Sequence, residues 1–81
     1  MSAVKLEDAR RVISAAENKA MEIGQPMNIA VADEGGNDGK IMIFAGGVPL
    51  KREGKIVGAI GVSGGSGDQD HAVATAGAAA F

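Results

Sequence analysis

Hydrophobic residues near the start of the chain recur every three or four positions. From Leu6 to Ile23 this spacing lines one face with apolar side chains, and polar or charged residues cover the rest. Gly24 and Pro26 follow at once, and residues of this kind end helices. The pattern therefore predicts an amphipathic helix over residues 6–23, in which Glu7 and Arg11 are spaced to form an ion pair.

Two stretches after this helix have the composition of strands. Met27–Asp33 alternates larger apolar residues with Asn28 and two alanines, and Ala30 and Ala32 offer a low surface on which a helix would lie closely. Lys40–Ala45 is apolar on both of its faces, which suits a strand that is covered on both sides. Val48–Lys51 extends it as an edge segment, because proline is tolerated at sheet edges.

A third strand follows after a short turn. Arg52–Lys55 has a glycine where a hairpin turn requires a positive φ, and Ile56–Ser63 is rich in β-branched residues. The short connection predicts that Lys40–Leu50 and Ile56–Ser63 are antiparallel neighbours. Gly58 and Gly61 interrupt the strand, which indicates a bulge or the close approach of another backbone.

The segment after this strand begins with glycines and continues as a helix. Ser66 and Gln69 have the spacing of a capping box, and Asp68 and Asp70 place negative charge where the helix dipole favours it. The helix is predicted over residues 68–80 and carries almost no bulky side chain. Gly77 would let another backbone approach closely, whether that of the sheet, of the first helix or of a second subunit.

Composition narrows the class of protein. The 81 residues predict a single domain over residues 1–81, and the chain has no cysteine and only two aromatic residues. Such a small core makes homo-oligomerisation, as a dimer or larger assembly, an expected source of stability. A net charge of −2 carries no signature of nucleic-acid or membrane binding, and the polar first residues lack the apolar run of a signal peptide, so the expected compartment is the cytoplasm.

Together these elements predict an α+β fold, with an antiparallel three-stranded sheet and helices at the N- and C-terminal ends. Two segments of the sequence then carry a resemblance to a known family. They read LEDARRVISAAENKAMEIGQPMNIAVADEGGN and GGVPLKREGKIVGAIGVSGGSGDQDHAVATAGAAAF, and both resemble the GlcG/HbpS-like, or haem-degrading, domain family. The run VGAIGVSGG followed by DQDHAVA is the more specific of the two.

The resemblance implies a reduced profilin-like domain. In the order it implies, Ile56–Ser63 is the central strand, with Met27–Asp33 on one side and Lys40–Leu50 on the other. Family members form oligomers, and some bind or degrade haem. The two segments resemble the two ends of the family domain, so the middle of that domain is expected to be missing here.

His71, the only histidine in the chain, is the main candidate for binding haem iron or a metal. Its imidazole would ligate haem iron or a metal, with a sixth ligand from a methionine, a lysine or a second subunit; the alternative is an ordinary surface histidine. The neighbouring residues Gly64, Gly65, Ser66 and Asp70 are predicted to contribute to the same ligand site. Phosphate binding at this turn is disfavoured by the two aspartates, and neither Ser63 nor Ser66 has the partners of a hydrolytic triad.

Two classes of function follow. The first is a small ligand-binding domain, for which the resemblance implies haem or a related tetrapyrrole. The second is an oligomeric assembly module without ligand or catalysis, based on the small-residue surfaces. Whether the chain is an enzyme stays open, because no catalytic residue is assigned.

Overall fold

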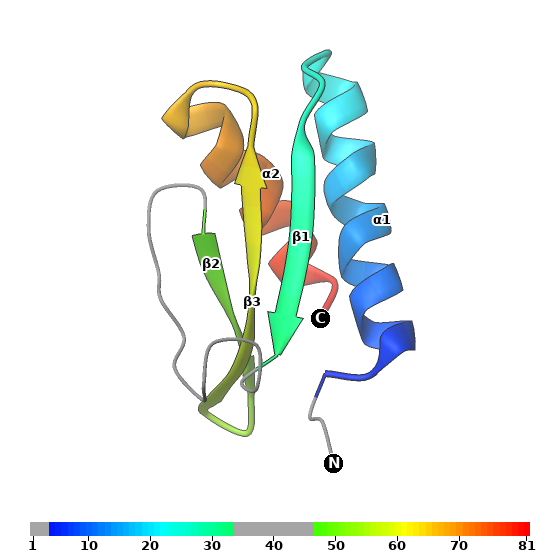
Figure 1. Cartoon of the computed structure of the whole chain (residues 1–81), viewed down its shortest axis with the longest axis vertical. Helices are drawn as coiled ribbons and strands as arrows, with labels where there is room; N and C mark the ends of the chain where they lie inside the picture. Colours follow the sequence, from blue (N-terminus) through cyan, green and yellow to red (C-terminus); the bar gives the residue numbers. More distant parts are fainter. Residues whose placement is uncertain (1–3, 34–46) are drawn as a thin grey trace.

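The computed structural model describes residues 4–33 and 47–81, which form two helices and three strands (Figure 1). In chain order the elements are α1 (Leu6–Ile23), β1 (Asn28–Asp33), β2 (Gly47–Arg52), β3 (Lys55–Ser63) and α2 (Gly67–Ala79). The strands form one antiparallel sheet in the order β1-β3-β2. The predicted fold class and the central place of the third strand are confirmed, while the expected strand over Lys40–Ala45 lies outside the described residues.

Local signals place the helix ends within one residue of their predicted positions. Gly24 adopts the left-handed conformation (φ 78°) and its N–H donates to Ala20 O at 2.9 Å, which closes the last turn of α1. At the start of α2, Ser66 Oγ accepts a hydrogen bond from the N–H of Gln69 at 3.2 Å, and Gln69 Oε1 accepts from the N–H of Ser66 at 2.9 Å. The predicted capping box is therefore present.

A two-residue turn joins β2 to β3. Glu53 and Gly54 both have positive φ, of 54° and 78°, which is the combination found in type I′ hairpins. The register shifts by one residue between Leu50 and Lys51, so that Leu50 pairs with Gly58. Lys51 pairs with Ile56, so Val57 has no partner in β2 and Gly58 lies next to a bulge, as the sequence indicated for this glycine. β2 with its Pro49 forms an edge of the described sheet.

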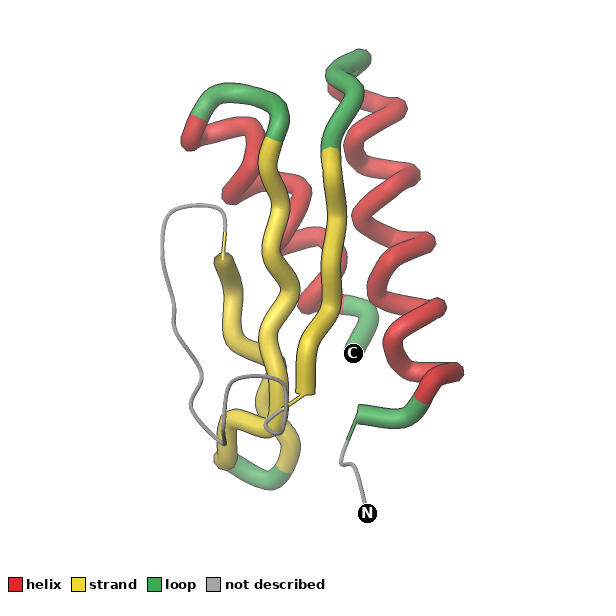
Figure 2. Tube along the Cα trace, viewed as in Figure 1, coloured by secondary structure: helices red, strands yellow, loops and turns green. Residues whose placement is uncertain are grey.

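Both helices lie on the same face of the sheet (Figure 2). Ile60 and Val62 of β3 point toward them, and Ile29 and Val31 of β1 pack against the same core. The expectation that a helix lies on Ala30 and Ala32 is therefore wrong, since Ala30 is exposed on the other side. The buried apolar residues of this single core come from both helices, β2 and β3: Val12, Ala16, Ala20, Leu50, Ile60, Val62, Val73 and Ala74.

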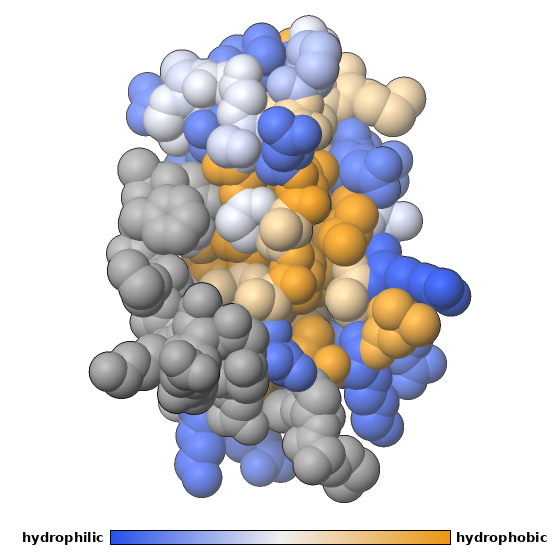
Figure 3. Space-filling view, in the orientation of Figure 1, coloured by the Kyte–Doolittle hydropathy of each residue, from blue (hydrophilic) through white to orange (hydrophobic). Residues whose placement is uncertain are grey.

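The face of the sheet away from the helices carries small residues. In the paired register Ala30 lies beside Gly61, and Ala32 beside Ala59. Figure 3 looks onto this side of the molecule and shows apolar residues gathered over β1 and β3. Among the described residues no helix covers this face, so two helices do not enclose the sheet.

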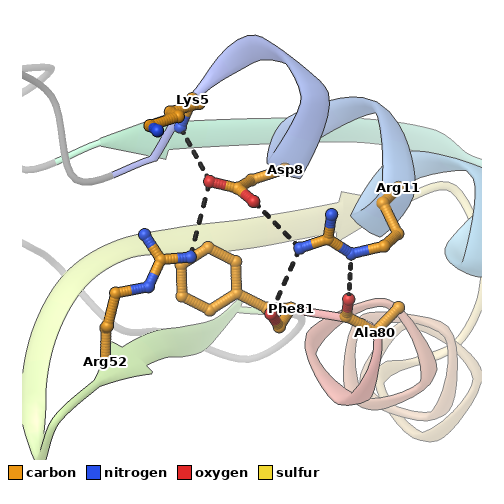
Figure 4. Close-up of polar contacts among 6 residues, drawn as sticks. All are labelled: Lys5, Asp8, Arg11, Arg52, Ala80 and Phe81. Carbon is orange, nitrogen blue, oxygen red and sulfur yellow. Dashed lines mark hydrogen bonds and ion pairs between the residues drawn. The ribbon is translucent and has the colours of Figure 1, made fainter.

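A polar cluster joins the start of α1 to the end of the chain (Figure 4). Asp8 Oδ1 accepts from Arg11 Nη2 at 2.9 Å. Asp8 Oδ2 accepts from the N–H of Lys5 at 3.0 Å and from Arg52 Nη2 at 3.4 Å. Arg11 also donates to Ala80 O at 2.6 Å, and the Arg52 guanidinium lies 4.5 Å from the centre of the Phe81 ring. Arg11 therefore pairs with Asp8 and α2, and the predicted pair with Glu7 is not formed.

This cluster predicts how stability depends on pH. The N–H of Lys5, followed by the Arg11 guanidinium, lowers the pKa of the Asp8 carboxyl below its usual 3.8, against an opposing effect of burial. A carboxyl with a lowered pKa stabilises the fold above the pKa of the unfolded chain, and this stabilisation is lost as the pH falls through the folded-state pKa. The Asp8→Asn variant should unfold at a lower temperature than the wild type at pH 7, with the two curves converging as the pH falls from about 5 toward 2.

Thermal unfolding followed by circular dichroism between pH 2 and pH 7 measures this convergence. Glu7→Gln is the matched control, because Glu7 is an exposed carboxylate in the same turn and has no ion pair among residues 4–33 and 47–81. A constant difference between wild type and Asp8→Asn at every pH would contradict the role given to the charge of Asp8.

Candidate functional site

The predicted ligand residues lie together in the connection between β3 and the start of α2. Gly64 approaches the start of β1: a side chain added there would meet Pro26 O at 3.0 Å and Met27 Cα at 3.2 Å. Gln25 ties the two segments together, because its Nε2 donates to Gly64 O at 3.0 Å. The loop is thus seated against the segment that links α1 to β1, some forty residues away in the sequence.

The polar groups of this loop are largely used to hold its own shape. Asp70 Oδ1 accepts from the N–H of Gly65 at 2.9 Å, and the Ser66 and Gln69 side chains bond each other's backbone. These N–H groups therefore face carboxylate, amide or hydroxyl oxygens of the same loop. The arrangement gives no support to a phosphate site, and the prediction that Gly64, Gly65, Ser66 and Asp70 contact a ligand stays a prediction.

His71 has a different environment from its neighbours. It is exposed and lies at the start of the second turn of α2, which begins at Gly67. It makes no hydrogen bond or ion pair with any other residue of the described part of the chain. Its imidazole nitrogens are therefore available to a ligand. Within the same part of the chain, no group of three His, Cys, Asp or Glu residues is placed to hold a metal ion.

An apolar groove lies next to the loop, where α1 ends and β1 begins. It measures about 370 Å³, and Met21, which is 79% exposed, stands on its α1 side. Met27 forms part of the groove and also reaches the loop, since a side chain added at Gly65 would meet its Cε at 3.0 Å. Glu17 and Gln25 supply the polar atoms at its border. The groove thus combines two thioethers with one carboxylate and one amide.

The sequence pattern does not predict this groove. Its only sign in the sequence is a pair of methionines, Met21 and Met27, on either side of residues 24–26. Methionine more often fills a hydrophobic core, so this pair does not indicate a surface groove. Met21 is exposed at the end of α1, whereas Met27, just before β1, is half-buried; α1 runs beside β1 (Figure 1). A second hollow of about 510 Å³ lies at the other end of the same seam and is bordered by Leu6, Ala9 and Val31.

The fold defines a class of protein: a two-layer α+β domain with an antiparallel sheet and both helices on one face. The family described as haem-degrading, HbpS-like proteins matches residues 4–38 and 36–79. The chain belongs to this family, which confirms the resemblance found in the sequence. None of the described helices is long and apolar enough to span a membrane.

Solved structures with the same fold are distant in sequence. Protein ORFY of Klebsiella pneumoniae, from family DUF336, superposes with a TM-score of 0.85 at 22% identity, covering 100% of this chain and 92% of that one. A PduOC:heme complex gives 0.80 at 21% identity, covering 98% and 95%. HbpS of Streptomyces reticuli, in the form of a double mutant, gives 0.83 at 24% identity, covering 98% and 87%. These structural similarities show that the chain has the same fold as the three proteins.

A curated relative matches a shorter part of the chain. It is an uncharacterized 15.0 kDa protein of Citrobacter freundii, from the dhaT-dhaS intergenic region, and it is 50% identical over 38 residues. The match spans 47% of this chain and only 27% of the relative. The matched part of the chain covers about a quarter of that protein, so this match shows nothing about activity or partners for this chain.

Proposed function

We propose that residues 1–81 act as one small ligand-binding domain, with haem or a related tetrapyrrole as the ligand. The family is described as haem-degrading, and one protein of the same fold is a heme complex. The observation that carries the proposal is the state of His71, whose imidazole is exposed and has no partner within residues 4–33 and 47–81. A histidine imidazole is a common axial ligand of haem iron.

The residues present fit a haem held at the surface of the domain. His71 is exposed and lines neither of the two grooves, so a haem ligated by it would lie on the surface and keep one side toward solvent. His71 would hold the iron, and Gly64, Gly65, Ser66 and Asp70 of the neighbouring loop would contact the ring or its substituents. The iron, when bound, would supply the redox and ligand-exchange chemistry, whereas the chain itself contributes binding and orientation.

The test is a haem titration followed by absorbance. The wild type should give a shifted Soret band that saturates, and His71→Ala should lose that shift or weaken haem binding by at least about tenfold, because the iron ligand is removed. Thr75→Ala is the matched control, since Thr75 is exposed on the next turn of the same helix. Equal titrations of all three proteins would contradict the assignment of His71.

A second candidate is an assembly module without ligand. It is favoured by the small-residue face of the sheet, where Ala30 lies exposed beside Gly61 and no described helix covers it. In either case we propose a homo-oligomer, because a chain of this size, in which both described helices lie on one face of the sheet, buries a modest share of its apolar surface. Titration of the wild type without any Soret shift would favour the assembly module. A cytoplasmic location stays a prediction.

A further inference from the structure

The side of α1 that borders β1, the outermost strand on one side of the described sheet, carries both apolar and charged residues. Leu6, Arg10, Ile13, Glu17 and Met21 follow one another by three or four positions, so they form one stripe along the helix, here called the outer stripe. Leu6 and Met21 are 68% and 79% exposed, and they are two of the three large exposed hydrophobic residues described. The stripe thus leaves apolar groups in water at both of its ends.

Each end of the outer stripe lies beside one of the two hollows along the seam between α1 and β1. Met21 borders the groove of about 370 Å³, together with Ala20, Met27 and Ile29. Leu6 borders the hollow of about 510 Å³ at the opposite end. The two residues are separated by about 22 Å, given a rise of 1.5 Å per residue. A protruding apolar side chain and an apolar groove therefore occur at each end of the same helix.

The charges of the outer stripe are placed symmetrically between these ends. Arg10 lies four residues after Leu6, and Glu17 lies four residues before Met21. Both are exposed, and neither forms an ion pair among residues 4–33 and 47–81. They cannot reach each other easily within one helix, since side chains pair over three or four positions and these are seven apart.

We infer that the outer stripe of α1 is the contact between two copies of this chain, arranged antiparallel about a two-fold axis near residues 13 and 14. This arrangement places Arg10 of each copy opposite Glu17 of the other. It also brings Leu6 of each copy to the groove at Met21 of the other, and places Ile13 near the axis. A two-fold contact requires such a self-complementary surface, and the outer stripe has it in both charge and shape.

This inference deepens the proposed homo-oligomer and does not depend on haem binding. The outer stripe lies to one side of the core residues Val12, Ala16 and Ala20 of the same helix, and Arg10 and Glu17 are exposed, so these two residues can be exchanged with little effect on the core. The helix pair also leaves α2 and its exposed His71 accessible.

Sedimentation equilibrium of single and double charge reversals tests the contact. The wild type should dimerise reversibly, and Arg10→Glu or Glu17→Arg alone should raise the dimer Kd about tenfold, because each places like charges opposite each other at two symmetric positions. The double variant Arg10→Glu/Glu17→Arg should return to within about threefold of the wild type, since both pairs are restored with exchanged signs. Asn18→Arg adds charge outside the stripe and should leave the Kd unchanged.

Other outcomes would overturn the inference in distinguishable ways. If the wild type dimerises and neither reversal changes its Kd, the oligomer uses a different surface, such as the open sheet face. If both single reversals weaken the dimer but the double variant does not recover, the charges do not face each other. A wild type that is monomeric at every concentration would reject both this contact and the homo-oligomer, while a Soret shift would still establish haem binding. Thermal unfolding of dilute samples verifies that each variant is folded.

Discussion

The Ile60→Ala variant is expected to lose about 2–5 kcal/mol of the free energy of unfolding, the usual range for removing a large aliphatic side chain from a core. Ile60 is fully buried in the middle of β3, where its neighbours in the sheet are Val31 and Val48. A chain of this length is held together by only about 4–12 kcal/mol in total. The loss is a large share of that total, so the variant should unfold at a clearly lower urea concentration than the wild type.

Urea unfolding followed by far-UV circular dichroism measures this loss, and it is the suitable probe because the chain contains no Trp or Tyr. Ile56→Ala is the matched control, since Ile56 lies on the same strand but is 44% exposed. Its loss should be below about 1 kcal/mol, because less apolar surface is returned to water. Equal losses at the two positions would mean that the helices do not pack on the face of the sheet that carries Ile60.

The Gly77→Val variant is expected to lose about 2–3 kcal/mol of stability, because the core has no space for the added atoms. A Cβ at this position would lie 3.1 Å from Val12 O of α1 and 3.2 Å from Ala16 Cβ. Its closest contact would be with Ile60 Cδ1, at 2.5 Å. Since the backbone of α1 cannot yield as a side chain can, the two helices would be forced apart.

Two further variants separate this crowding from helix propensity. Ala79→Val, at an exposed position of α2, should cost only the propensity difference, less than about 0.7 kcal/mol. Gly77→Ala combined with Ile60→Val should be more stable than the sum of the single losses predicts, by about 0.5–1 kcal/mol, because the second change removes the atom that the new Cβ meets. Chemical unfolding of the wild type, Gly77→Ala, Ile60→Val and the double variant gives this coupling energy. Strictly additive losses would contradict the contact between position 77 and Ile60.

The elements of this fold were predictable because the signals that define them are local. Both helices begin and end at residues with a short-range role, such as Gly24 after α1 and the Ser66–Gln69 box before α2. The two-residue turn at Glu53–Gly54 likewise determines that β2 and β3 are antiparallel neighbours. The position of β1 beside β3 was predicted from the family resemblance, because no local feature of the β1 sequence indicates which strand it pairs with.

The candidate site was predictable only in part. Gly64 to His71 are contiguous in sequence, so a ligand loop could be proposed from that stretch alone. The groove beside it depends on Gln25 and Met27, which meet Gly64 and Gly65 only after the chain has folded. Nothing in the local pattern distinguishes Met21, an exposed residue beside this groove, from a core methionine.

Taken by itself, the sequence determined the type and limits of each helix, the hairpin and the family, because capping, turn geometry and periodicity act over a few residues. The tertiary structure decided what those elements face. β1 is apolar on both sides, so only packing could select Ile29 and Val31 for the core and leave Ala30 outside. The tertiary structure also places the backbone of α1 next to Gly77. It brings Arg52 into contact with Asp8, which lies 44 positions earlier in the sequence. Such contacts depend on which surfaces bury the most apolar area together, and that is a property of the assembled chain.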